Sequence, residues 1–323
     1  MVTRRAFLMS TAALATMLPA LSGRAEAWPA RPVRLIIPFP PGGLTDGIAR
    51  LTAQRLEERL GQPFVPENEP GAAGAIAATT VAHAPADGYT LFVGSLTQIA
   101  VIPALHPVSY DPVKDFSPIS NIASAPFVLM INADIPARTV AEFVAYVRQR
   151  PGQLSYASSG AGSTVHLTMA LFLQRAGLDM VHVPYKGSAQ AIPDLLSGRV
   201  AAYFGTTTDA LQQGQSDKLR LLAVSDEKRS GQFPDLPTLA EAGYPGFHTR
   251  TWNGLMAPAG TPQPIIDKLA REVQRAVADP AFAASLAKIG VDPVGGDPRS
   301  FAATIAADMS VWANAVRVAG LKS

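Results

Sequence analysis

The sequence predicts an α/β protein built as two lobes. Strand-like and helix-like segments alternate from residue 33 onward, and the alternation occurs in two separate series. The chain has 323 residues, of which 48% are hydrophobic, and this is long enough to expect two lobes rather than one. Two glycine-rich segments each lie between a predicted strand and a predicted helix, where open α/β sheets bind ligands.

The first 27 residues indicate an export signal. Arg4 and Arg5 precede a mildly apolar run over residues 6–21, and Ala25-Glu26-Ala27 is a small-x-small cleavage pattern. Paired arginines followed by Phe and Leu are typical of twin-arginine signals, although the general export pathway stays open. An uncleaved anchor is the alternative, but the run is shorter than the ~20 apolar residues of a membrane span. We expect a soluble mature chain outside the cytoplasm.

The first strand and helix series covers residues 33–93. Its first strand, residues 33–39, is apolar and β-branched, and the turn Pro40-Pro41-Gly42-Gly43 ends it. Apolar residues then recur at spacings of three and four until Gly61, which predicts a helix that stops there. The further elements expected are a strand from Phe64, a helix over 74–83 and a strand over 89–93. This order is typical of a parallel sheet with covered faces.

The second series repeats this pattern and leads into the C-terminal helices. Strands are expected at 127–131, 154–157, 181–183, 201–204, 221–224 and 251–256. Helices are expected at 139–149, 164–176, 189–196, 265–277 and 301–318. Glycine and proline are spread between these segments, so they mark turns rather than disorder.

Composition excludes several classes of function. The formal net charge is +2 and the sequence has no basic block, so it lacks the positive region typical of proteins that bind nucleic acid. The chain contains no cysteine, which excludes disulfides, thiolate metal sites and a catalytic thiol. None of the five histidines forms a His-x-x-x-His or His-Glu-x-x-His pair, so we expect neither a metal nor a cofactor.

The first glycine-rich segment, called loop 1 here, comprises residues 39–46. Glycine lets the backbone approach a ligand, and the following helix presents unpaired N–H groups at the positive end of its dipole. Such a loop is a potential anion site, but a tight turn with Thr45 as helix cap explains the same residues equally well. Asp46 would repel an anion, so we expect it to bond neighbouring backbone, meet an amino group, or simply begin the helix.

The second segment, loop 2, comprises residues 158–164 and offers serine hydroxyls, glycine N–H groups and another helix N-terminus. Gly160 and Gly162 have the spacing of a dinucleotide loop, but Val165 occupies the third glycine position. We therefore do not expect nucleotide binding. If the two loops belong to different lobes, neutral donors from both would hold a carboxylate. Neither loop contains Lys, Arg or His, which favours reversible capture over turnover.

The sequence gives little support for an enzymatic function, and we predict that the chain is not an enzyme. There is no Gly-x-Ser-x-Gly nucleophile elbow. His166 lies one turn into the helix after loop 2 and is a candidate for the binding pocket; a packed or surface histidine is the alternative. An exported hydrolase with a Ser-His-Asp set assembled from distant positions stays open, because such triads are defined by geometry.

Seven ordered motifs extend over essentially the whole mature chain. They begin with Trp28-Pro29-x-Arg31-Pro32-Val33, Pro38-Phe39-Pro40-Pro41-Gly42-Gly43-x-Thr45-Asp46, Glu67-Asn68-Glu69-Pro70-Gly71-Ala72-x-Gly74 and Pro85-x-Asp87-Gly88-Tyr89-Thr90-Leu91. They continue with Tyr110-Asp111-Pro112-x-x-Asp115-Phe116, Val183-Pro184-Tyr185-Lys186-Gly187 and Ala257-Pro258-Ala259-Gly260-Thr261-Pro262. With these motifs the chain resembles the Bug family of periplasmic receptors, the solute-binding component of tripartite tricarboxylate transporters.

This resemblance implies a periplasmic-binding-protein-like fold. Each of two α/β lobes would contain a mostly parallel sheet flanked by helices, with two crossovers between the lobes and the ligand in the cleft. We expect lobe 1 to comprise residues 28–127 and 252–323, and lobe 2 residues 128–251.

The resemblance also implies a small carboxylate ligand: an amino acid, a di- or tricarboxylate, or an aromatic acid. In the family the two loops hold one carboxylate, partly through water, and segments equivalent to 95–97 and 205–207 line the cleft. Gly205 stands where many relatives have an acidic residue, so recognition of an amino group does not carry over, and the ligand's far end is unassigned. The residues expected to bind the ligand are Phe39, Pro41, Gly42, Gly43, Thr45, Asp46, Ser95, Thr97, Ser158, Ser159, Gly162, Ser163, Thr164, His166, Tyr185, Gly205 and Thr206.

The implied partners are the transporter's two integral membrane subunits, contacted transiently. We expect a monomer that binds one ligand and closes its lobes around it. A component that presents the ligand to a membrane signalling kinase would use the same pocket and is the alternative.

Overall fold

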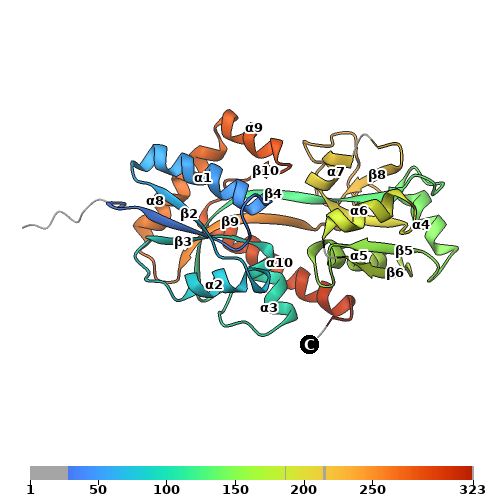
Figure 1. Ribbon diagram of the computed structural model, residues 1–323, viewed down its shortest axis with the longest axis horizontal. Helices are drawn as coiled ribbons and strands as arrows, with labels where there is room; N and C mark the ends of the chain where they lie inside the picture. Colours follow the sequence, from blue (N-terminus) through green and yellow to red (C-terminus); the bar gives the residue numbers. More distant parts are fainter. Residues whose placement is uncertain (1–27, 186, 214–215, 322–323) are drawn as a thin grey trace, which may run out of the picture.

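The computed structural model has two lobes side by side, joined by strands that pass between them (Figure 1). It describes residues 28–185, 187–213 and 216–321, so the expected export signal lies outside the described residues. The strands form one sheet path in the order β2-β1-β3-β9-β4-β7-β5-β6, with β8 and β10 each paired to β4. The alternating pattern in the sequence thus gives the two-lobed α/β fold that was predicted.

Lobe 1 contains the outer strands of the first series and the last helices of the chain. Its strands are β1 (Val33–Ile37), β2 (Phe64–Asn68), β3 (Thr90–Ser95) and the short β10 (Asp292–Pro293). Its helices are α1 (Leu44–Leu60), η1 (Ala72–Gly74), α2 (Ala75–Ala82), η2 (Thr97–Val101), α3 (Ile102–Leu105), α8 (Gln263–Val277) and α9 (Pro280–Lys288). The pairs β1–β2 and β1–β3 are parallel, and β3 pairs with β9 antiparallel.

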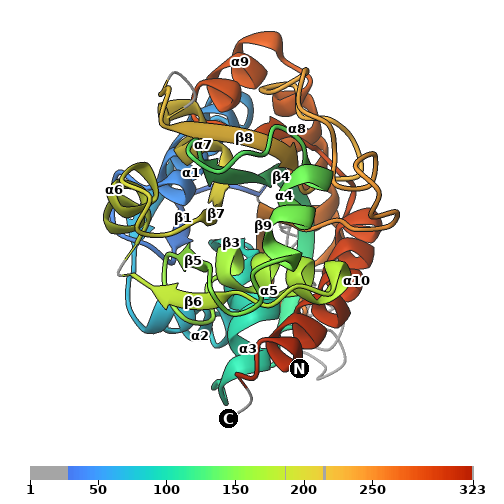
Figure 2. The ribbon, with the colours of Figure 1, turned by 90° about the vertical axis from the view of Figure 1, so that its right-hand side faces the viewer.

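Lobe 2 is built in the same way from the second series. Its strands are β5 (Ser155–Ser158), β6 (Val181–Pro184), β7 (Ala202–Thr206) and β8 (Leu219–Val224). Its helices are α4 (Val140–Arg148), α5 (Thr164–Ala176), α6 (Ser188–Leu196) and α7 (Thr207–Gln213). The pairs β5–β6 and β5–β7 are parallel, and Figure 2 shows α6 on one side of these strands and α5 on the other.

Two long strands connect the lobes. Residues 116–126 of β4 (Phe116–Asn132) pair antiparallel with β9 (Arg250–Pro258), and residues 127–132 pair with β7 and β8 of lobe 2. The sequence predicted only residues 127–131 as a strand, which was too short. The missed part contains Pro118 and Asn121, residues that are depleted in strands, and the register shifts beside both of them.

Helix ends follow the local chemistry of the sequence. Gly61 takes the left-handed conformation (φ 73°) and ends α1, as predicted. Thr139 and Glu142 form a reciprocal capping box at the start of α4. Helix α5 has the predicted bounds, and Ser163 caps its first turn by accepting a hydrogen bond from the backbone of His166.

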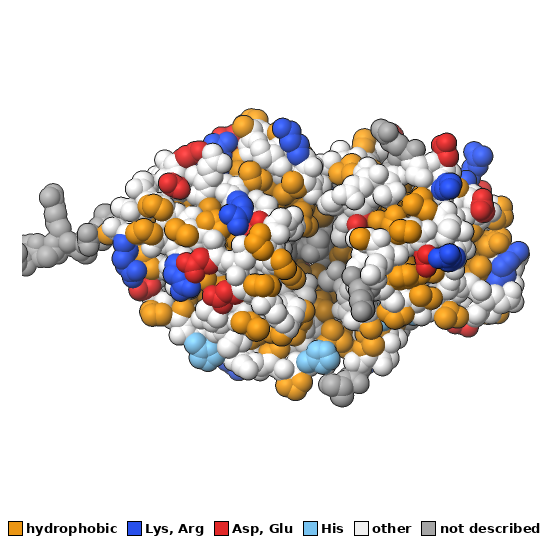
Figure 3. Space-filling view, viewed as in Figure 1, with side chains coloured by type: hydrophobic (Ala, Val, Ile, Leu, Met, Phe, Trp, Pro, Cys, Tyr) orange, Lys and Arg blue, Asp and Glu red, His pale blue; other side chains and the backbone are white. Residues whose placement is uncertain are grey.

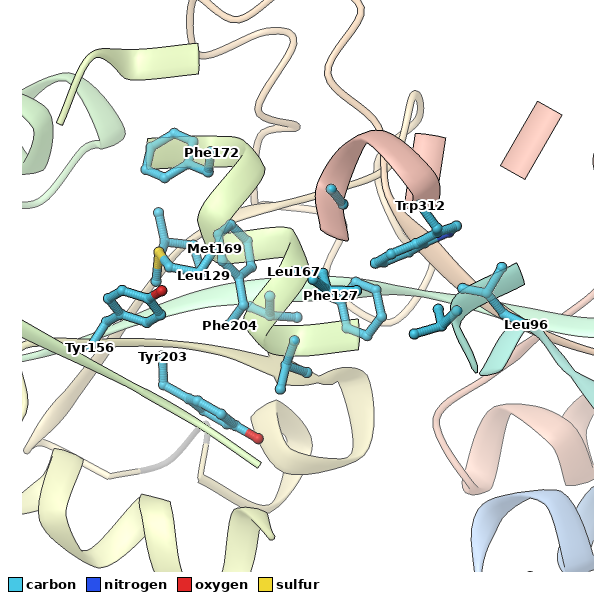
Figure 4. Close-up of a cluster of buried hydrophobic side chains, with 14 of the residues drawn as sticks. Leu96, Phe127, Leu129, Tyr156, Leu167, Met169, Phe172, Tyr203, Phe204 and Trp312 are labelled. Carbon is cyan, nitrogen blue, oxygen red and sulfur yellow. The ribbon is translucent and has the colours of Figure 1, made fainter. Parts of the chain in front are cut away.

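The long last helix, α10 (Pro298–Val318), ties both lobes to the crossing strands. It packs against η2 and α3 of lobe 1, β4, and α5 of lobe 2. Trp312 lies edge-on to Phe127 of β4 with ring centroids 6.5 Å apart, in a cluster of buried side chains drawn from both lobes (Figure 4). Trp252 of β9 donates from Nε1 to the buried Asp308 of α10 at 2.7 Å. Within the described ranges, no helix combines the length and the apolar character needed to cross a bilayer.

Candidate functional site

A furrow separates the two lobes on the face seen in Figure 3. Besides the packing of α10 against α5, close contacts join the two lobes elsewhere. The hydroxyl of Thr208 in α7 donates to the carbonyl of Ile289 at 3.0 Å, and that of Thr207 donates to the carbonyl of Gly290. Elsewhere, Gly162 of loop 2 lies against Leu105 of α3, so closely that a Cβ at Gly162 would be 2.9 Å from Cδ1 of Leu105. The contacts of Thr207 and Thr208 lie near loop 1, and that of Gly162 involves loop 2 itself.

Loop 1 connects β1 to the N-terminus of α1. Pro41, Gly42 and Gly43 are exposed, and Gly42 has the positive φ of 86° that favours glycine. Gly43 is the N-cap of α1, and no side chain bonds to this helix end. The first N–H groups of α1 therefore have neither an intrahelical acceptor nor a side-chain cap, and they are available to an anion.

The carboxylate of Asp46 fixes the conformation of loop 1 by hydrogen bonds. Its Oδ2 accepts from the amide of Gly42 and from Nε of Arg50, and its Oδ1 accepts from Nδ2 of Asn68, each at 2.9 Å. The hydrogen bond from Arg50, assisted by those from Gly42 and Asn68, lowers the pKa of Asp46 to about 2. Of the three roles left open for Asp46, the structure shows the bond to neighbouring backbone. Its carboxylate is buried and its charge is matched by Arg50.

Two asparagines outside loop 1 complete its support, and sequence reasoning missed both as site residues. Asn68, at the end of β2, also donates to the carbonyl of Phe39 at 2.9 Å. Asn253 of β9 donates to the hydroxyl of the buried Thr45 at 2.8 Å. Asn68 belongs to one of the seven motifs, which was the available signal; Asn253 is distant in sequence and carried none.

Loop 2 connects β5 to α5 and is held by hydroxyls and an imidazole. Ser163 caps α5 and donates to the carbonyl of Gly160 at 2.7 Å. The amide of Gly162 donates to Nδ1 of His166 at 3.1 Å, which requires an unprotonated Nδ1. Gly160 and Gly162 have φ values of 138° and 78°, so both positions favour glycine.

His166 is buried in an aromatic stack behind loop 2. Its ring lies parallel to that of His182 of β6, with centroids 3.7 Å apart, and Tyr156 of β5 stacks on His182 at 5.0 Å. Burial, with a smaller contribution from His182, lowers the pKa of His166 to about 4, and burial also lowers the pKa of His182. His166 therefore supports the loop from behind as a neutral ring.

Ser158 and His182, which are residue types found in catalytic triads, form a close pair. The Ser158 hydroxyl lies 2.7 Å from Nε2 of His182 and 3.0 Å from the carbonyl of Gly160, and it accepts from the amide of Gly160 at 3.2 Å. The serine is fully buried. In the described part of the chain no carboxylate bonds to His182, so the pair lacks the third member of a triad. It fixes the turn of loop 2.

The segments after β3 and β7 are also tied to their own lobes. The buried Ser95 donates from its hydroxyl to Oε1 of Gln98 at 2.7 Å, and Thr97 beside it is half-buried. Thr206 and Asp209 bond reciprocally at the start of α7, with distances of 2.9 and 3.1 Å. Gly205 is buried, and a Cβ there would meet Cε of Met130, so a side chain at this position would require that of Met130 to move.

The remaining predicted residues occupy the rim of loop 2. Ser159 and Thr164 are half-buried, and among the described residues no side chain or backbone group bonds to their hydroxyls, so they are open to a ligand. Tyr185 is half-buried, but its hydroxyl donates to Asp194 at 2.8 Å within lobe 2. The described residues contain no group of three or more His, Asp or Glu arranged to hold a metal ion.

A cavity of about 310 Å³ adjoins loop 1 and includes residues from both lobes. Its lining consists of Gly42, Gly43, Leu44, Asp46, Gly47, Thr208, Lys288 and Ile289. The structure therefore supplies, next to the open end of α1, a space that lobe 2 helps to enclose.

Known proteins resemble this chain over most of its length. The family described as the tripartite tricarboxylate transporter family receptor matches residues 48–321. Protein BugT of Bordetella pertussis is 39% identical over 300 residues, which cover 92% of each chain. The structure of Rpa4515 of R. palustris with adipate is 39% identical with a TM-score of 0.77, covering 91% of this chain and 98% of that one. MatC of Rhodopseudomonas palustris with bound malate is 34% identical with a TM-score of 0.72, covering 89% and 99%. The resemblance inferred from the motifs is confirmed.

Proposed function

Since the chain belongs to the receptor family of the tripartite tricarboxylate transporters, we propose that it captures a small carboxylate in the furrow between its lobes and delivers it to the transporter's membrane subunits. The mature chain acts in the periplasm after removal of residues 1–27. It binds its ligand without chemical change.

The observation that carries this proposal is the pair of helix starts beside the furrow. Helix α1 begins at loop 1 in lobe 1, and α5 begins at loop 2 in lobe 2. Each helix N-terminus favours a negative charge, and glycine lets a ligand approach the backbone. Because neither loop contains a cationic side chain, the donors are neutral and pre-organised. This arrangement suits release as well as capture.

The ligand carboxylate lies between the amides of Gly42 and Gly43 on one side and Ser159, Ser163 and Thr164 on the other. The amide of Gly42 already donates to Asp46, so it lies near the ligand without bonding to it. The free N–H groups at the start of α1 donate to the ligand carboxylate. The remaining predicted residues shape the two loops and the furrow from behind.

The two lobes move as units about the crossing strands. The proposed division places residues 28–127 and 252–323 in lobe 1 and residues 128–251 in lobe 2. Support comes from the pairing of β4, which changes from β9 to β7 and β8 between Pro126 and Phe127. A hinge at this position closes the loops on the ligand.

Binding to a panel of carboxylates tests the proposal. The mature chain, residues 28–323, is incubated with mono-, di- and tricarboxylates and aromatic acids while its melting temperature is recorded. A ligand at 100 times its dissociation constant stabilises the folded state by about 2.7 kcal/mol, a shift of several degrees. Mass spectrometry of the ligand after incubation should show it unchanged. A ligand that is consumed would identify an enzyme, and a panel without any thermal shift would contradict carboxylate binding.

A further inference from the structure

The residues that line the cavity beside loop 1 include a lysine that has no role in the site described above. Lys288 is the last residue of α9, and it lines this cavity together with Gly42 and Gly43. Its side chain is exposed and makes no hydrogen bond or ion pair within the described part of the chain. A lysine with no partner among the described residues thus lines the cavity beside the open N-terminus of α1.

The other charges at the cavity compensate one another. Asp46 also lines it, but the carboxylate is buried and bonded to Arg50, Asn68 and the amide of Gly42. Arg50 lies four residues along α1 and balances the charge of Asp46. Lys288 is therefore left as the uncompensated charge, and its positive sign attracts a second anionic group.

Lobe 2 fixes the opposite wall of the cavity. Thr208 lines it and donates from its hydroxyl to the carbonyl of Ile289, the residue after Lys288. This bond keeps the end of α9 against α7. The cavity is consequently part of the region between the lobes, and Gly42 and Gly43 of loop 1 line it.

We propose that Lys288 binds the second carboxylate of a dianionic ligand and so selects dicarboxylates over monocarboxylates. This inference rests on the proposed function, because loop 1 and loop 2 must hold the first carboxylate. The neutral donors of the loops recognise one carboxylate whatever stands at the far end of the molecule. A fixed positive charge at a distance from them distinguishes the two classes of ligand.

The test compares adipate with its monomethyl ester, which has nearly the same length but lacks the second charge. Affinities of both are measured by calorimetry for the wild-type mature chain and for Lys288→Gln. We expect the wild type to prefer adipate, and Lys288→Gln to reduce that preference roughly threefold to fivefold, as is usual for an exposed ion pair. Lys288→Glu should reduce it further. Higher salt should weaken the wild-type preference and leave that of Lys288→Gln nearly unchanged.

Lys218→Gln is the matched control, because Lys218 is an exposed lysine at the start of β8 in lobe 2 and makes no side-chain bond in the described residues. It should keep the wild-type preference. If Lys288→Gln binds both compounds with the wild-type ratio, Lys288 has no role in selection, whereas carboxylate binding itself stands. If the wild type binds neither compound, while other ligands are bound, the inference about linear dicarboxylates is wrong. Binding of no carboxylate at all would overturn the proposed function as well.

Discussion

Loop 1 and loop 2 each connect a strand to the N-terminus of a helix, but they are held in place by different chemistry. In loop 1 a buried carboxylate, that of Asp46, ties the amide of Gly42 to Arg50 and Asn68. In loop 2 the same task falls to the neutral ring of His166 and the hydroxyls of Ser158 and Ser163. One frame is ionic and the other is neutral.

The difference shows that two glycine-rich loops at helix starts can be held in place without a cationic side chain in either loop. In loop 1, Arg50 forms an ion pair with Asp46, so the two side chains hold the loop in place and add no net charge. In loop 2, burial keeps His166 neutral, and a neutral ring can accept from Gly162. The two frames should respond differently to mutation and to acid.

The largest expected effect comes from filling the space in front of loop 1. Gly43 has φ −82°, and a Cβ there would meet nothing nearer than the carbonyl of Pro40 at 3.7 Å, so Gly43→Trp should fold. The indole would cover the start of α1, and we expect carboxylate affinity to fall by roughly 100-fold or more. Calorimetry measures the affinity and thermal unfolding checks the fold. Gly231→Trp serves as control, because Gly231 is exposed and a Cβ there would meet nothing nearer than Oδ1 of Asp292 at 3.9 Å. Wild-type affinity in Gly43→Trp would exclude loop 1 from the site.

Removing the ionic frame should cost stability next. Asp46→Ala leaves Arg50 and the amide of Gly42 without their acceptor, and we expect the free energy of unfolding to fall by about 3 kcal/mol. Asp87→Ala breaks an ion pair with Arg31 whose side chains are 45% and 61% exposed, and it should cost less than about 1 kcal/mol. Denaturant unfolding measures both variants. Equal losses would show that burial of Asp46 adds nothing.

Acid should act on loop 2 before loop 1. Folding lowers the pKa of His166 from 6.5 to about 4. Above pH 6.5 the imidazole is neutral in both the folded and the unfolded state and does not change stability. As the pH falls from 6.5 towards 4, the unfolded state binds a proton that the folded state does not, so stability is lost. Asp46, whose pKa falls from 3.8 to about 2, loses its contribution only below that range. We expect a loss of about 1.4 kcal/mol per pH unit from His166 below pH 6.

His166→Gln should make the pH dependence of unfolding shallower by that amount between pH 6 and pH 5. His83→Gln is the matched control, since His83 is exposed at the end of α2. Unfolding free energies measured at pH 7, 6 and 5 provide the comparison. A pH dependence in His166→Gln equal to that of the wild type would show that His166 is not the group that responds to acid.

The smallest effect should come from the cap of α5. Ser163→Ala removes the hydroxyl that accepts from His166 and donates to Gly160, and we expect a loss of about 1 kcal/mol with a modest loss of affinity. Helix α1 has no side-chain cap that an equivalent mutation would remove. Ser285→Ala, at a half-buried position within α9, is the control. If both variants lose the same stability, the cap has no special weight.

The sequence predicted the repeated elements and the two loops because local rules govern them. Helix α5 between Ser163 and Gly177, and the stop of α1 at Gly61, follow from capping and glycine conformation. The first part of β4 was missed because its pairing with β9 overrides the poor strand propensity of its residues.

Within the candidate site, the sequence predicted that the two glycine-rich loops precede helices, but not which side chains support these loops. Asn253 reaches Thr45, and Lys288 shares a cavity with Gly43, only because the chain returns to lobe 1 after building lobe 2. Such contacts depend on tertiary structure, and no spacing rule indicates them.

The packing of α10 limits how the molecule can open. The helix touches α3 on one side and α5 on the other, and its Trp312 lies on Phe127 where β4 passes between lobes. Two strands alone would permit both swinging and twisting of one half relative to the other. A stiff rod anchored across the pivot opposes the twist, because turning would shear its tightly packed side chains. For the lobe closure proposed above, this leaves mainly one coordinate, a swing in which the glycine-rich turns would part and meet again in the same register.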